Sequence, residues 1–291
     1  MVGKEFLKNI LVPIDRSTSS LMAEEMAALL AKMTGATVTV LHVIQRAVPL
    51  YVQTDTSYNF PNKVMDEVTG ALEQEGEKLV NNAQVLFHAD KVQVKTEILR
   101  EQDPPDSILE YSNAGYDLIV IGVHGENEPD PYTLGSVAKK VIMHAKIPTL
   151  IIKSVSSLSS LLVCVDGSEH SIKALEYGIR LAKKMGSKIT LLNVQEHRLY
   201  KVSPKTAQDL GERIFSKALD AVGKEKLKID KKLEIGVPSD TIVKVADEGK
   251  YDLIVLGSRG LGTVKRFLLG SVSDDVSQKA KCSVLMVPAS A

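Results

Sequence analysis

Two segments of the chain place glycines at the same spacing. Residues 257–271 read GSRGLGTVKRFLLGS and residues 122–136 read GVHGENEPDPYTLGS, so both follow the pattern G-x2-G-x9-G-S. In each segment the last glycine and serine precede a predicted helix. A helix N-terminus offers backbone N–H groups and a positive dipole end, and glycine lets an anion approach the backbone closely. We therefore interpret both segments as candidate phosphate-binding loops.

A structural role would use the same residue types, because glycine favours turns and serine caps helices. A single copy would leave that alternative open. Two copies with identical spacing weaken it, since a turn tolerates many spacings. The pattern GxxxxGK[ST] of P-loop NTPases is absent, and DRSTSS and DGSEHS stand where a dinucleotide-binding domain would have GxGxxG.

The residues between the glycines differ in charge. The second segment contains Lys265 and Arg266, whereas the first contains three carboxylates and two prolines: Glu126, Glu128, Asp130, Pro129 and Pro131. Carboxylates repel phosphate, and proline has no N–H to donate. The sequence therefore predicts tighter anion binding by the second segment. His124 is a further candidate phosphate contact in the first segment, and Arg16 beside Asp15 could restore some positive charge there.

The chain is an internal duplication. Residues 10–43 align without a gap with residues 161–194, and YDLIVIGVHG at 116–125 aligns with YDLIVLGSRG at 251–260. The serine-rich segment 154–160 is the natural linker between the copies. We expect two domains, residues 1–154 and residues 158–291.

Each copy alternates apolar, β-branched strands with segments of helical spacing. In the first copy we expect strands at 9–15, 36–44, 91–99, 116–122 and 149–153, and helices at 18–34, about 62–88, 104–115 and after Gly135. Near-continuous apolar strands separated by helices imply parallel sheets covered on both faces. The predicted fold class is α/β, with two tandem doubly wound domains.

In such sheets, ligands bind beyond the carboxyl ends of the strands. Asp15 and Asp166 end the first strand of each copy, and Gly122 and Gly257 end the fourth. The candidate residues therefore converge on one edge of each sheet.

The glycine pattern, the aspartate after the first strand and the LHV of the second strand resemble the universal stress protein family, over nearly the whole chain as a tandem pair. The resemblance implies five-stranded parallel sheets of order 3-2-1-4-5, like those of the adenine nucleotide alpha hydrolases. It also implies ATP or AMP, with or without Mg²⁺, between the ends of strands one and four. Adenine would lie near Val165 and Val194, ribose near Asp166, and phosphates on the glycine loop.

The implied nucleotide contacts fall in both copies. In the second they are Val165, Asp166, Val194, Gly257, Arg259, Gly260, Gly270, Ser271, Val272 and Ser273. In the first they are Ile14, Asp15, Val43, Gly122, Gly125, Gly135, Ser136 and Val137. We assign no catalytic residue and no metal ligand, since the six histidines form no HExxH motif and His42 fits a structural role.

Three functions remain open. The resemblance favours a nucleotide-binding stress-response or signalling protein. A slow ATPase with water activated near Asp166 is the second, although no paired base or arginine finger supports efficient hydrolysis. The third is an interaction protein without nucleotide, which suits the first copy.

The composition argues against some classes of binding partner and indicates a cellular location. Lysine and arginine together number 36, as do aspartate and glutamate, so no net field attracts nucleic acid or an anionic membrane. No signal sequence or membrane span is recognisable, and we expect a cytoplasmic protein. Cys164 and Cys282 lie in apolar strand-like runs and are expected to be buried thiols.

The last strand of each copy, at 149–153 and 283–287, is short, apolar and at the predicted edge of its sheet. An exposed edge of this kind invites pairing. We therefore predict an internal pseudo-dimer joined through these strands, and the whole chain could form a further homodimer. Tyr51, Tyr58 and Phe60, in a segment that the second copy lacks, could form a lid or an interface, or pack over the pocket.

Overall fold

The computed structural model describes residues 6–45, 62–100, 102–125, 134–223, 227–260, 269–288 and 290. In the first half the elements are β1 (Asn9–Ile14), α1 (Thr18–Thr34), β2 (Thr37–Ile44), α3 (Asn62–Ala89), β3 (Val94–Arg100), α4 (Pro104–Ser112), β4 (Leu118–Gly122), α5 (Ser136–His144) and β5 (Thr149–Ile152). The second half contains β6 (Ser160–Cys164), α6 (Glu169–Met185), β7 (Lys188–Gln195), α7 (His197–Val202), α8 (Pro204–Val222), β8 (Ile229–Ile235), α9 (Pro238–Glu248), β9 (Leu253–Gly257), α10 (Ser271–Lys279) and β10 (Ser283–Val287).

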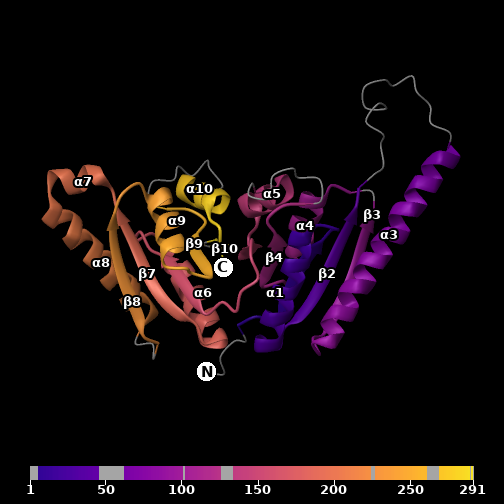
Figure 1. Cartoon of the computed structure of the whole chain (residues 1–291), viewed down its shortest axis with the longest axis horizontal. Helices are drawn as coiled ribbons and strands as arrows, with labels where there is room; N and C mark the ends of the chain where they lie inside the picture. Colours follow the sequence, from indigo (N-terminus) through magenta and orange to yellow (C-terminus); the bar gives the residue numbers. More distant parts are fainter. Residues whose placement is uncertain are drawn as a thin grey trace, which may run out of the picture.

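The strands of the described residues belong to one sheet, with the order β3-β2-β1-β4-β5-β10-β9-β6-β7-β8 (Figure 1). Within each half the strands are parallel and have the order 3-2-1-4-5, as predicted. At the centre β5 and β10 pair antiparallel, with Leu285 opposite Leu150. The α/β fold and the pairing of the halves through their last strands are therefore confirmed.

The duplicated sequence produces duplicated helix ends. Ser17 caps α1 by accepting a hydrogen bond from Ser20 N, and Ser168 caps α6 in the same way. Both helices end at a glycine with a left-handed backbone, Gly35 at a φ of 79° and the equivalent Gly186 at 73°. Serine at the start and glycine at the end suit these positions, because the hydroxyl replaces a missing acceptor and glycine carries no Cβ.

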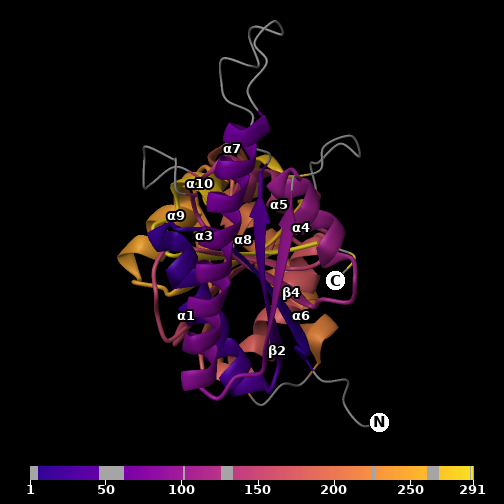
Figure 2. The same cartoon turned by 90° about the vertical axis from the view of Figure 1, so that its right-hand side faces the viewer.

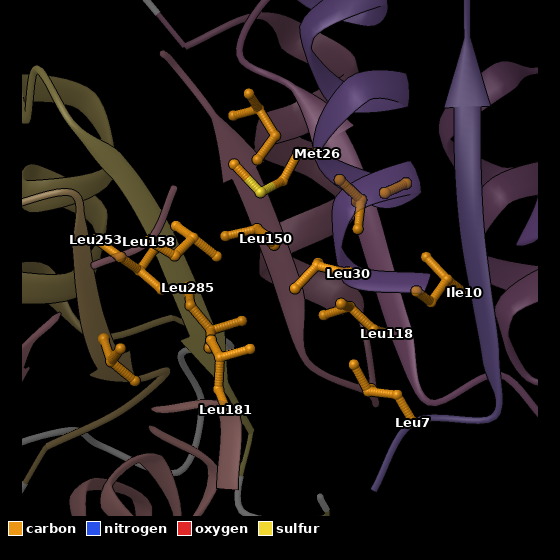
Figure 3. Packing of buried hydrophobic residues seen from close by; sticks show 14 of the residues in the cluster. Leu7, Ile10, Met26, Leu30, Leu118, Leu150, Leu158, Leu181, Leu253 and Leu285 are labelled. Carbon is orange, nitrogen blue, oxygen red and sulfur yellow. The ribbon is translucent and has the colours of Figure 1, made fainter. Parts of the chain in front are cut away.

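The helices cover both faces of the sheet. Figure 2 shows α1 and α3 on one side of the first half and α4 and α5 on the other. One apolar cluster contains residues of α1, α6 and both central strands, including Leu150 and Leu285 (Figure 3). A second cluster on the opposite face also contains residues of both halves. The two halves therefore share their cores across the central strands.

The structure differs from the sequence-based expectations in α4, in β3 and in the connection between the halves. Helix α4 ends at Ser112 instead of residue 115. Strand β3 begins at Val94 instead of residue 91, because Lys91 adopts a left-handed φ of 58° and ends a turn after α3. The serine-rich connection is anchored more firmly than a flexible linker: Leu158 is fully buried, and Ser159 Oγ donates to Asp252 Oδ2 over 2.8 Å.

Candidate functional site

A cavity of about 970 Å³ opens at the carboxyl ends of β6 and β9 in the second half. All the second-half residues that the sequence analysis proposed line it: Val165, Asp166, Val194, Gly257, Arg259, Gly260, Gly270, Ser271, Val272 and Ser273. The cavity therefore brings together residues from the ends of three strands and the start of one helix.

Asp166 lies at the turn between β6 and α6. Its Oδ1 accepts a hydrogen bond from Ser168 N (2.9 Å), and its own N–H donates to Ser171 Oγ (3.3 Å). A Cβ on Gly260 would come within 2.6 Å of Asp166 Oδ2. Glycine at 260 therefore lets the segment after β9 pass close to this carboxylate.

Gly257 has a packing role of its own. A Cβ there would lie 2.7 Å from the backbone carbonyl carbon of His170, in the first turn of α6. The first half repeats this contact, since a Cβ on Gly122 would lie 2.6 Å from Ser19 Oγ. The first glycine of each pattern is thus required for a helix to cross the end of a strand, whether or not a ligand binds.

The start of α10 lines one end of the cavity. Gly270 precedes the helix, donating its N–H to Ser258 O (2.8 Å) and accepting from Asp274 N (2.9 Å). Ser273 Oγ donates to Gly257 O (2.8 Å), which ties the helix to the end of β9. The N–H groups of the first turn have no acceptor within the helix and lie at its positive end. Ser271 and Val272 line the cavity there.

Sequence reasoning missed the polar wall of β7. Asn193 Nδ2 donates to Val165 O (2.7 Å), and Gln195 Nε2 donates to Asn193 Oδ1 (2.7 Å). Both side chains are buried and line the cavity. Two polar residues at the end of the apolar strand KITLLNVQ were the available signal.

Other residues that line the cavity lie outside the glycine pattern and the strand ends. Leu199, Leu210 and Ile214 of α7 and α8 form an apolar wall. Lys139 and Met143 belong to α5 of the first half and line the same cavity. The alignment of the two copies does not indicate that residues of the first half line the second-half cavity.

His170 contacts the residue that follows β9, with its Nδ1 3.3 Å from Ser258 Oγ. Burial lowers the pKa of His170, and the positive charge of Arg259 lowers it further. The imidazole is therefore predominantly neutral at neutral pH.

The first half has a smaller cavity, of about 290 Å³. Of the residues proposed for this half, Asp15 and Val43 line it. The others lie outside its wall: Ile14, Gly122, Gly125, Gly135, Ser136 and Val137. Among the described residues, this cavity therefore joins the strand-end aspartate to α3 and not to the glycine pattern.

Two side chains that line the first-half cavity differ from their second-half equivalents. His42 occupies the position of Asn193, with its Nδ1 3.0 Å from Ile14 O. Helix α3 packs closely on this ring, because a Cβ on Gly76 would come within 2.9 Å of His42 Cδ2. Arg16 forms an ion pair with Glu75 of α3. That contact turns the guanidinium toward α3, whereas the equivalent residue of the second half, Gly167, has no side chain.

His124, the other candidate in the first segment, has its Nδ1 buried without a hydrogen-bond partner among the described residues. Its backbone oxygen accepts hydrogen bonds from Ser17 Oγ (3.3 Å) and Ser19 Oγ. The second half has Arg259 in the equivalent position, lining the large cavity.

Several predicted features lie outside the described residues. They are Tyr51, Tyr58 and Phe60, and the residues between the glycines: Glu126, Glu128, Pro129, Asp130, Pro131, Lys265 and Arg266. Within the described ranges, no group of three or more His, Cys, Asp or Glu is arranged to hold a metal ion. No described helix is long and apolar enough to cross a membrane.

Both cysteines are free thiols. Cys164 is buried in β6, and burial raises its pKa well above the ordinary range. Cys282, just before β10, is partly buried, and burial raises its pKa to about 11. The expectation of a buried thiol is confirmed for Cys164, whereas Cys282 is only partly buried.

The comparisons with known proteins agree with this architecture. The model of the universal stress protein family matches residues 7–153 and again residues 158–288. Universal stress protein YxiE of Bacillus subtilis is 35% identical over 145 residues, which cover 44% of this chain and 98% of that protein. A universal stress protein from Archaeoglobus fulgidus shares the fold over 97% of this chain and 98% of its own, with a TM-score of 0.71 and 23% identity. A universal stress protein solved in complex with cAMP matches 46% of this chain and 99% of its own, with 30% identity and a TM-score of 0.36.

Proposed function

Because this chain belongs to the universal stress protein family, we propose that its second half binds an adenine nucleotide, ATP or AMP, as part of a stress response. The observation that carries the proposal is the cavity of about 970 Å³, which collects every residue that the motif resemblance assigned to the second half.

The proposed arrangement follows the chemistry of the walls. Val165 and Val194 offer apolar surface to the adenine, and Asp166 offers a carboxylate oxygen to the ribose hydroxyls. The phosphates would lie at the start of α10, where Ser271 and Val272 present helix-start N–H groups. Each part of the nucleotide thus meets a surface of matching polarity.

Binding, rather than rapid turnover, is the proposed activity. Asp166 Oδ1 already accepts the N–H of Ser168, and this contact holds the turn that starts α6. An efficient hydrolase would need a group placed to orient the attacking water. We therefore propose a nucleotide-dependent binding protein, in which the ligand changes the surface offered to a partner.

Isothermal titration calorimetry of the full chain with ATP, AMP and GTP tests the proposal, preceded by mass spectrometry of small molecules released on denaturation. We expect adenine nucleotides to bind and GTP to bind more weakly. Asp166→Asn should weaken ATP binding about tenfold, because a neutral amide is a poorer acceptor for ribose hydroxyls than a carboxylate.

Asp15→Asn is the matched control, because Asp15 Oδ1 accepts the N–H of Ser17 as Asp166 Oδ1 accepts that of Ser168. The amide oxygen can keep that contact in both variants. ATP affinity should stay within about twofold in the control. A wild-type protein that releases no adenine nucleotide and binds neither ATP nor AMP would exclude the proposed function.

A further inference from the structure

We propose that Lys139, on α5 of the first half, binds the terminal phosphates of the nucleotide held by the second half. The inference rests on the proposed function and deepens it, because it makes the nucleotide site a property of the paired halves. A half without its neighbour would lack this charge.

The pairing of β5 with β10 produces the required geometry. It brings α5 and α10 to the same end of the molecule, on either side of the central strands (Figures 1 and 2). Lys139 and Met143, one helical turn apart on α5, both line the cavity that contains the first turn of α10. One face of α5 is therefore a wall of the second-half site.

The charge of Lys139 is available for a ligand. Its side chain is exposed, and among the described residues no carboxylate forms an ion pair with it. The next residue is different: Lys140 Nζ lies 2.8 Å from Asp106 Oδ1 and 3.5 Å from Asp103 Oδ2. Two adjacent lysines of one helix thus have separate roles, one facing the cavity and one pairing with α4 and the residue before it.

The cavity also contains a negative charge near the start of α10. Asp274 of α10 lines the same cavity and accepts a hydrogen bond from Gln278 Nε2 (2.9 Å). A lone carboxylate near the start of α10 would repel phosphate, and a lysine on the facing wall offsets it. Lys139 attracts phosphate groups but not an uncharged nucleoside. Its charge should therefore raise the affinity for ATP more than the affinity for adenosine.

The first half contributes a lysine to the cavity of the second half, but α10 has no lysine at the equivalent position. Asp274 is the second-half equivalent of Lys139, in GSVSDDVSQK against GSVAKKVIMH. The two halves therefore do not exchange the same charge across the central strands. The structure gives the second-half site a cation from its neighbour and gives α10 a carboxylate at the matching position.

Calorimetry of the full chain with ATP and with adenosine tests this inference on Lys139→Met, which removes the charge and keeps an unbranched side chain that is one atom shorter. We expect ATP to bind about five- to tenfold more weakly and adenosine affinity to stay within about twofold, because one partly solvated charge pair is lost. Lys139→Arg should stay within about threefold of the wild type for ATP, since it retains the charge.

Lys140→Met is the matched control and should leave both affinities within about twofold, because that charge is directed to α4. Unchanged ATP affinity in Lys139→Met, or equal losses of ATP and adenosine, would overturn the role of Lys139 while leaving the proposed nucleotide site intact. A wild-type protein that binds neither ATP nor adenosine would overturn both proposals.

Discussion

Glu24 is a carboxyl group enclosed by the first half. It lies on α1 with 3% of its surface exposed, where the second half has Leu175 in its apolar core. Its Oε1 accepts a hydrogen bond from Ser20 Oγ (3.5 Å), and that hydroxyl also accepts from Asp15 N (3.1 Å). Burial raises the pKa of Glu24 to about 7, despite this hydrogen bond. The carboxyl therefore links the folding free energy of the first half to pH.

The native protein should hold a proton on Glu24 between about pH 4.5 and 7, whereas the unfolded chain has released it. The wild type consequently loses up to about 3 kcal/mol of stability as the pH rises through this range. Glu24→Gln should remove that loss, because it stays neutral, and urea denaturation at pH 5 and pH 8 measures the difference.

Glu25→Gln is the control for this prediction, because Glu25 is exposed on the same helix. It should keep the pH dependence of the wild type. If Glu24→Gln and Glu25→Gln show the same change in stability between the two pH values, Glu24 is not the buried acid that we describe.

At the scale of elements, the central feature is the pair β5 and β10. Leu150 and Leu285 face each other in the antiparallel register and are each 1% exposed. They join one apolar cluster with residues of α1 and α6 (Figure 3). Since both halves contribute to this cluster, a substitution that leaves a cavity there should lower the stability of both halves.

We predict that Leu285→Ala lowers the free energy of unfolding by ~2–5 kcal/mol, the usual cost of a cavity at a fully buried leucine. Urea denaturation gives this value, and hydrogen exchange in urea reports β2 and β7 separately. Both strands should lose protection at a lower urea concentration.

Val155→Ala is the comparison for this element, because Val155 is 50% exposed in the connection between the halves. It should change stability by less than about 0.5 kcal/mol. Loss of protection in β7 with none in β2 would contradict a shared core.

Elements that depend on local chemistry could be predicted from the sequence. The capping serines and terminal glycines of α1 and α6 follow local rules. The apolar strands predicted a parallel sheet, and the family resemblance added the strand order 3-2-1-4-5. Lys139 could not be predicted, because its place in the cavity depends on how two halves pack. Asn193 and Gln195 were missed because a polar residue in a strand signals a site only when its buried position is known.

At the scale of the whole molecule, duplication has produced two halves with the same fold and different cavities. The second-half cavity of about 970 Å³ reaches from Val194 to the start of α10. The first-half cavity of about 290 Å³ is bounded by His42 and by the ion pair between Arg16 and Glu75. We infer that the second half binds the nucleotide and that the first half supports it through the central strands and through Lys139.

This claim is tested most directly by titrating ATP into Gly270→Val and Gly135→Val in parallel. Both glycines precede a helix in extended backbone, with φ of −77° and −64°, which valine also adopts. Neither variant should therefore strain the backbone at its substituted residue, and the effect on binding can be compared. Gly270→Val should lose most ATP binding, because Gly270 lines the cavity at the proposed place of the phosphates, and Gly135→Val should stay within about twofold of the wild type. Equal losses, or a larger loss in Gly135→Val, would contradict the account.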